Sequence, residues 1–170
     1  MKTTGIVRRM DELGRVVIPK EMRRTMHLKE GEELEIFAGE DGLYLKKYSA
    51  ISALGARAHE YARVVARLLG AAVYVVDTDG VLALGGSAKD IGTGVSTKVV
   101  EAVARRQSRE LMDVSVQRGG EIYAHLVVWP ILAHGDLFGA LVVGKARPFD
   151  ACDRAVIETA CCLLAQQIGD

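Results

Sequence analysis

The sequence predicts two domains of different fold class, a small, mainly β domain followed by an α+β domain. Three observations support this division. The charges of the first 50 residues are segregated, the apolar segments there are short and separated by turns, and the later residues contain longer apolar strands and amphipathic helices. We place the first domain at residues 1–50, a connecting helix at 51–70 and the second domain at 71–170.

The charge distribution of the first domain is strongly asymmetric. Residues 1–29 contain eight basic and three acidic residues, a net charge of +5, although the whole chain has a formal net charge of zero. Residues 30–41 contain six acidic residues and no basic one. A basic and an acidic face on one small unit are typical of a protein that binds a polyanion. An ordinary solvated charged surface is the alternative.

The first domain is predicted to consist of four short strands and one short helix. The predicted strands are 5–10, 15–18, 34–36 and 43–45, with turns at 11–14 and 39–42. Pro19 suits the first turn of a helix, which we expect over residues 20–26. A unit of roughly 48 residues buries too little apolar surface to be stable alone, so we expect a second copy to complete its core.

Arginine supplies five of the eight basic residues of the segment 1–29. Its planar guanidinium bonds phosphate or guanine edges bidentately and stays charged. A two-fold dimer would present each arginine twice, which matches a duplex with pseudo-palindromic half-sites. The residues therefore predict a dimeric surface for double-stranded DNA. The alternative is a protein-interaction module whose basic head binds an acidic protein partner.

The first domain also resembles a known family. The residues GIVR at 5–8, LGRVVIPKE at 13–21, RR at 23–24 and EGEELEIF at 30–37 are similar to the N-terminal domain of the AbrB/SpoVT family of bacterial transition-state and sporulation regulators. The resemblance implies a swapped-hairpin (looped-hinge helix) fold in which two chains interleave their strands. It implies a transcription regulator of sporulation or stationary-phase type, activator or repressor, that selects DNA by sequence or by shape.

The resemblance also assigns candidate DNA contacts. The family's DNA-contacting arginines match Arg8, Arg15, Arg23 and Arg24 of this sequence. By charge and position alone, we further expect phosphate contacts from Lys2, Arg9 and Lys20. Short relatives that act as antitoxins carry a disordered tail, whereas this sequence continues for about 120 residues of globular composition.

The connecting helix is predicted over residues 53–69 and is closed by Gly70. Leu54, Tyr61 and Leu68 recur at heptad spacing along it. Such a stripe suits either a short dimerising helix pair or packing of the helix on its own domain. The residues leave both interpretations open.

The second domain is predicted to alternate strands and helices. We expect strands at 71–76, 81–84, 111–117, 121–132 and 137–145, and helices at 95–107 and from about 150 to 168. The stretch VVWPILAHGDLFGALVVG resembles the central hairpin of GAF domains. The resemblance implies a GAF-like sensor and oligomerisation domain, and a tetramer if heads and tails pair with different copies.

The second domain offers one candidate ligand site and no catalytic one. Tyr123, His125 and Trp129 alternate along a predicted strand and could line a pocket for a small-molecule effector, although a hydrogen-bonded core histidine is the alternative for His125. We find no set of nucleophile, base and orienting acid, and therefore predict no enzyme and no cofactor. We predict no metal site, because the three cysteines contain no C-x-x-C pair.

The chain contains no apolar run of the ~20 residues that would cross a bilayer. Its N-terminus lacks the apolar region of a signal peptide. The odd number of cysteines does not indicate a disulfide framework. We therefore expect a cytoplasmic protein.

Overall fold

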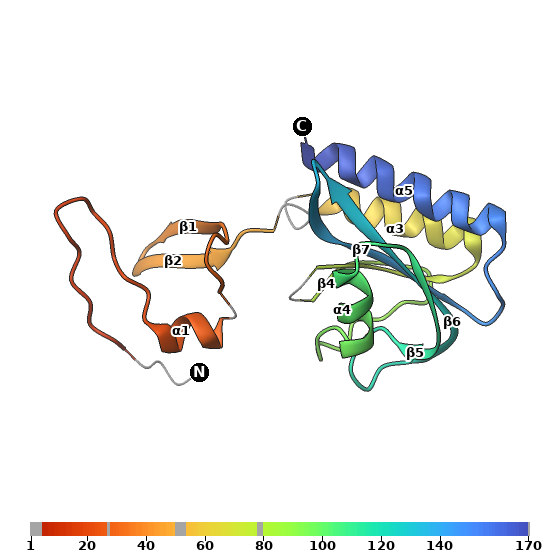
Figure 1. Ribbon diagram of the computed structural model, residues 1–170, viewed down its shortest axis with the longest axis horizontal. Helices are drawn as coiled ribbons and strands as arrows, with labels where there is room; N and C mark the ends of the chain where they lie inside the picture. The colour runs from red at the N-terminus through yellow and green to blue at the C-terminus, as the bar shows by residue number, and fades with distance from the viewer. Residues whose placement is uncertain (1–4, 27, 50–53, 78–79, 170) are drawn as a thin grey trace. The chain divides into compact units, whose positions relative to one another are not determined.

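The computed structural model describes residues 5–26, 28–49, 54–77 and 80–169. The chain divides into two compact units, residues 1–48 and 49–170, which we call the head and the tail. Figure 1 shows the elements of each unit, and each unit is described by itself. No helix in these described ranges is long and apolar enough to span a bilayer.

The head contains a short helix and a two-stranded hairpin. Helix α1 is Lys20–Thr25, strand β1 is Leu34–Gly39 and strand β2 is Gly42–Lys47. The two strands are antiparallel, and Gly39 faces Gly42 at the turn. The sequence predicted the hairpin because the apolar residues alternate on both sides of a glycine-rich turn. It predicted the helix because Pro19 suits the first turn of a helix.

The first two predicted strands, at 5–10 and 15–18, are not formed in the single chain. The turn between them is present, since Gly14 N donates to Asp11 O at 3.0 Å and Asp11 N donates to Arg15 O at 3.0 Å. Beyond the turn the two segments are open and are not assigned as strands (Figure 1). A strand requires a neighbour that pairs with its backbone groups, and the described part of the head offers none.

The apolar side chains of the head are almost all exposed. Among its described residues only Pro19 is buried. The exposed fractions of Val7, Leu13 and Val17 are 90%, 75% and 74%. The other large apolar side chains that are exposed are Ile6, Met10, Val16, Met22, Met26, Ile36, Phe37, Leu43, Tyr44, Leu45 and Tyr48. A unit with these side chains in water lacks a core, so the head is incomplete without a second chain.

The tail is built on one antiparallel sheet of five strands in the order β4-β3-β7-β6-β5. The strands are β3 Ala72–Val76, β4 Val81–Gly85, β5 Arg109–Ser115, β6 Ile122–Ala133 and β7 Asp136–Lys145. The helices are α3 Ala56–Leu69, α4 Thr97–Ala104 and α5 Ala151–Gly169. All of these elements were predicted from hydrophobic periodicity, and α4 is shorter than predicted.

Helices cover both faces of the sheet and form two cores. Helices α3 and α5 pack side by side on one face, as Figure 1 shows, and their apolar residues cluster with Val73, Val127 and Leu141. Helix α4 contributes Val99 to the cluster on the other face. This three-layer α+β arrangement is held together mainly by burial of aliphatic side chains.

The apolar residues at heptad spacing near and along α3 were predicted to pack either on a second helix or on their own domain. Ala58 and Val65 are buried, and Leu54 and Tyr61 pack against the same core. Leu68, however, is 63% exposed. The stripe therefore packs mainly on its own domain, and its last residue is left on the surface.

Candidate nucleic-acid interface

Six basic side chains of the head, the described candidates for DNA contacts, are exposed and come from three local structures. Arg8 and Arg9 lie on the open segment before the turn, and Arg15 directly follows the turn. Helix α1 carries the other three, Lys20, Arg23 and Arg24. Lys2 lies outside the described residues. All six described side chains are therefore accessible to a ligand in solution.

Helix α1 presents Arg23 and Arg24 in its last turn. It begins after Pro19, whose φ of −58° already matches helical backbone. Glu21 in the first turn and the two arginines in the last turn have the charges that the helix dipole favours. In the described part of the chain, neither guanidinium forms an ion pair. Their charge is available to an external anion.

Arg15 is held by Asp11 across the turn. Oδ1 of Asp11 accepts from the backbone N–H of Leu13 at 3.0 Å and of Arg15 at 2.8 Å. Oδ2 of Asp11 accepts from Nε of Arg15 at 2.7 Å. These bonds, the backbone bond from Arg15 first, lower the pKa of Asp11 below its usual value. Asp11 was not among the residues singled out from the sequence, although a carboxylate four residues before an arginine across a glycine turn was a detectable signal.

Glu32, one of the acidic residues that follow α1, has basic partners within the head. Oε1 of Glu32 lies 3.0 Å from Nζ of Lys47, and Oε2 of Glu32 accepts from the backbone N–H of Lys29 at 2.9 Å. The Lys29 bond is the main reason why the pKa of Glu32 is lowered. Glu35 faces Lys46 across the two strands. The ion pair that Glu32 forms is thus with Lys47 of β2, not with an arginine of residues 8–24.

Tyr123 and Trp129, two of the three residues predicted to line an effector pocket with His125, pack with different core clusters. Tyr123 packs in the cluster beneath α4, whereas Trp129 packs against the cluster beneath α3 and α5. Strict alternation fails along β6, since Tyr123 and Leu126 belong to the same cluster. The neighbouring strand β5 is also irregular at this level: Asp113, between the partners of His125 and Tyr123, has a φ of 53°, far from extended backbone.

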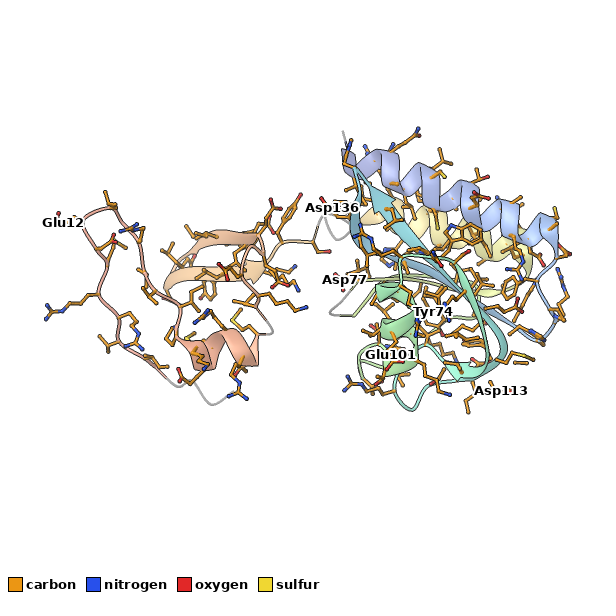
Figure 2. The ribbon with its side chains drawn as sticks, viewed as in Figure 1. Glu12, Tyr74, Asp77, Glu101, Asp113 and Asp136 are labelled. Carbon is orange, nitrogen blue, oxygen red and sulfur yellow. The ribbon has the colours of Figure 1, made fainter. Side chains whose placement is uncertain are left out.

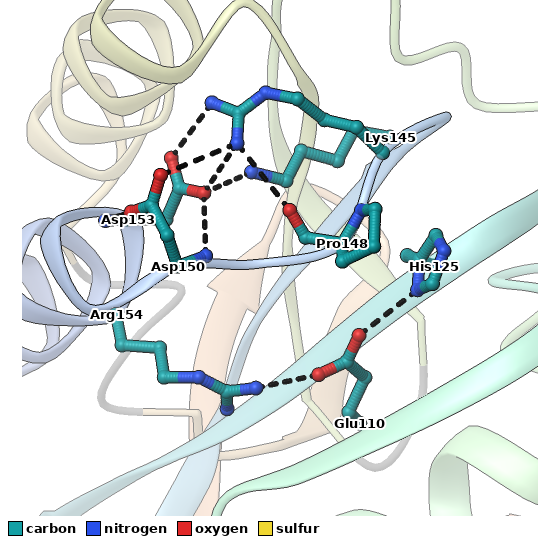
Figure 3. A network of polar contacts seen from close by, with 8 residues as sticks. Glu110, His125, Lys145, Pro148, Asp150, Asp153 and Arg154 are labelled. Atoms are coloured by element: carbon teal, nitrogen blue, oxygen red, sulfur yellow. Dashed lines mark hydrogen bonds and ion pairs between the residues drawn. The ribbon is translucent and has the colours of Figure 1, made fainter.

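The side chain of His125 belongs to a polar network that links β6, β5 and α5 (Figure 3). Its Nδ1 lies 3.0 Å from Oε1 of Glu110 on β5. The other carboxylate oxygen of Glu110 accepts from Arg154 of α5 at 2.5 Å. A histidine satisfied by its own domain was the alternative reading of the sequence, and the structure supports that alternative.

Tyr123 lines one surface hollow of the tail, of about 340 Å³, together with Glu121 and Lys145. Two further hollows are lined by residues that the sequence did not indicate as pocket residues. One, of about 280 Å³, has polar lining residues that include Lys89, Gln117 and Glu121. The other, of about 340 Å³, lies between α3 and α5 and is almost wholly apolar. Val64, Leu68 and Leu163, all exposed, line this second hollow, which we call the α3–α5 groove.

Comparison with known proteins gives matches along the whole chain. Residues 53–169 match the family described as Stage V sporulation protein T C-terminal, transcription factor. Residues 7–52 match the family described as antidote-toxin recognition MazE, bacterial antitoxin. The chain is 42% identical over 176 residues to Stage V sporulation protein T of Bacillus subtilis (strain 168), and the alignment covers 99% of each protein.

The two domains also have separate relatives. Over 48 residues, 28% of this chain, the sequence is 58% identical to half (50%) of the transition state regulatory protein AbrB of the same bacterium. A solved structure of the cofactor binding GAF domain of the nutrient sensor CodY from Clostridium difficile matches 65% of this chain and 83% of that one, with a TM-score of 0.52 and 21% identity, and this likeness shows the fold alone. The predicted AbrB-type head and GAF-like tail are confirmed. The chain belongs to the Stage V sporulation protein T family.

Proposed function

We propose that this chain is a transcription regulator of sporulation or stationary-phase type whose paired heads bind double-stranded DNA. One observation carries the proposal. Six basic side chains between residues 8 and 24 are exposed. Of these six, only Arg15 has an acidic partner among the described residues. The full-length similarity to a protein named for a stage of sporulation supports the biological setting.

The head binds DNA as a dimer because a single head has no core. A second copy covers the exposed apolar side chains, and the open segments at 5–10 and 15–18 become strands by pairing with it. The two-fold pair repeats Arg8, Arg15, Arg23 and Arg24 at a fixed spacing. If four arginines of each protomer contact phosphates, about eight counterions are displaced, and the slope of log K against log salt is about −7.

The test is a salt titration of DNA affinity with the full chain. The double variant Arg15→Ala, Arg23→Ala should flatten the salt slope by about 3 to 4, because a dimer loses four contacts. The control variant Arg105→Ala, Arg118→Ala removes the same charge from exposed positions of the tail, and it should leave the slope unchanged. A shallow slope that the head variant does not alter would replace DNA by an acidic protein as the partner.

We propose further that the tails pair through the α3–α5 groove, so that the chain forms a tetramer. The occupant is the same face of a tail from another head dimer, because each tail exposes an apolar stripe that a second copy would cover and each head dimer carries two such tails. Leu68→Glu with Leu163→Glu should reduce a tetramer to a dimer in light scattering. An unchanged mass would exclude this face.

The tail also senses a small polar molecule in the hollow lined by Lys89, Gln117 and Glu121. Its charged and amide groups could recognise a polar ligand, and the related CodY domain is described as cofactor binding. A panel of polar metabolites should raise the melting temperature of the chain, and Glu121→Gln should abolish the rise. If no compound shifts melting, the tail only oligomerises.

A further inference from the structure

The turn before Arg15 is built around one side chain, Asp11. Its Oδ1 atom takes the backbone N–H groups of Leu13 and Arg15, at 3.0 and 2.8 Å, and so fixes the backbone of the turn. Its Oδ2 atom takes Nε of Arg15 at 2.7 Å and so fixes the guanidinium. Gly14, with a φ of 75°, supplies the left-handed conformation that closes the turn.

The bond from Asp11 uses the one N–H of Arg15 that DNA recognition does not need. A guanidinium has five N–H groups, and a single one lies on Nε. The two terminal nitrogens, which form the fork that grips a phosphate or a guanine edge, are not bonded to Asp11. Nε of Arg15 is therefore held by Asp11, while the two terminal nitrogens remain available for DNA.

We propose that Asp11 is a positioning residue that aims the guanidinium of Arg15 at DNA. This inference rests on the proposed function, because it requires that Arg15 contact the duplex. The side chain of Arg15 is 73% exposed and would otherwise sample many rotamers. A contact that is oriented before binding loses less conformational entropy when the complex forms.

The proposal opposes the expectation from charge alone. A carboxylate near DNA repels the phosphates, so removing it should strengthen binding. Glu12 is the matched comparison, since it lies at the tip of the same turn (Figure 2) and is exposed. Within the described residues Glu12 forms no hydrogen bond and no ion pair. If charge alone mattered, neutralising either acid would have the same effect.

The experiment compares Asp11→Asn with Glu12→Gln in the full chain. The probes are a labelled duplex enriched from a random pool by the wild-type protein, and poly(dI-dC). Asparagine retains an oxygen for the two backbone N–H groups, but its amide NH2 cannot accept from Nε of Arg15. We expect Glu12→Gln to bind both probes as tightly as wild type or more tightly, and Asp11→Asn to bind the enriched duplex roughly two- to fivefold more weakly.

A double-mutant cycle separates orientation from structure. In an Arg15→Ala background, Asp11→Asn should act like Glu12→Gln, because there is no guanidinium left to orient. Equal melting temperature and mass of all variants would show that the head is still folded and paired. If Asp11→Asn tightens binding as much as Glu12→Gln does, or remains as harmful without Arg15, the positioning role is overturned.

The same series tests the proposed function separately. If Arg15→Ala weakens binding while Asp11→Asn matches Glu12→Gln, only the positioning role fails. If Arg15→Ala leaves the affinity unchanged, Arg15 is not a DNA contact, and the positioning role falls with it.

Discussion

Lys145 of β7 and Asp153 of α5 form an ion pair that is almost fully buried, since the exposed fractions of the two residues are 7% and 4%. Asp153 also accepts from Arg147 Nη1 at 2.9 Å and from the backbone N–H of Asp150 at 3.0 Å (Figure 3). Nζ of Lys145 lies 4.2 Å from the ring centroid of Phe149. The pair ties the last strand to the first turn of the last helix.

Asp153→Asn should destabilise the tail strongly. The variant leaves the Lys145 ammonium buried without a counter-charge, and breaking a buried pair in this way costs about 3 to 5 kcal/mol. Urea unfolding measures the change. Glu158→Gln, which neutralises an exposed acid of the same helix, should stay within about 0.5 kcal/mol of wild type. Equal effects of the two variants would contradict the role of the pair.

Acid should weaken the tail in a defined pH window. Burial would raise the pKa of Asp153, but the bonds from Lys145, the Asp150 backbone and Arg147 outweigh it and lower the pKa from 3.8 to about 2. Because the folded-state pKa is depressed, the stabilisation is complete above about pH 4 and is lost as the pH falls through about 2. Unfolding free energies measured across this window should decline in the wild type, and less steeply in Asp153→Asn.

Gly85→Ala should destabilise the contact between α3 and β4. A Cβ at Gly85 would lie 2.1 Å from the backbone oxygen of Ala62, so the helix would have to move away from the strand. Overpacking of this kind costs about 1 to 3 kcal/mol. Gly80→Ala is the matched control, since a Cβ there meets no atom within 4 Å. Thermal unfolding that is unchanged in both variants would argue against the close approach.

Leu164→Ala should destabilise the tail far more than Leu163→Ala. Both residues lie on α5, but Leu164 is fully buried in the core, whereas its neighbour Leu163 is 41% exposed. Truncation of the buried leucine leaves a cavity and costs about 2 to 5 kcal/mol. Chemical denaturation of both variants at low protein concentration, where the tails are apart, gives the comparison. Equal losses would mean that the helix has a different buried face.

The stability of the head should depend on protein concentration. A unit whose apolar side chains are covered only by a second copy unfolds more easily on dilution. Hydrogen exchange of the β1 and β2 amides in the full chain should therefore slow as the concentration rises, while the tail core stays equally protected. Protection of the hairpin that persists on extreme dilution would show that a single head folds alone.

Periodicity along the chain was sufficient to predict the helix and hairpin of the head and every strand and helix of the tail. These elements are local, because alternation or a 3.6-residue repeat of apolar side chains selects each one. The charge asymmetry of residues 1–41 and the resemblance of 5–37 to known regulators likewise predict the basic surface from the sequence alone.

Only the tertiary structure shows which predicted strands are paired and which core each side chain enters. The pattern at 5–10 and 15–18 predicted strands, but the single head forms none there, because its described residues offer these segments no pairing partner. Tyr123 and Trp129, predicted to share a pocket, pack with opposite cores because the alternation of β6 breaks between Tyr123 and Leu126. Such placements, like the bond from Asp11 to Arg15, depend on local backbone conformation and on contacts between segments, which a one-dimensional pattern of polarity does not encode.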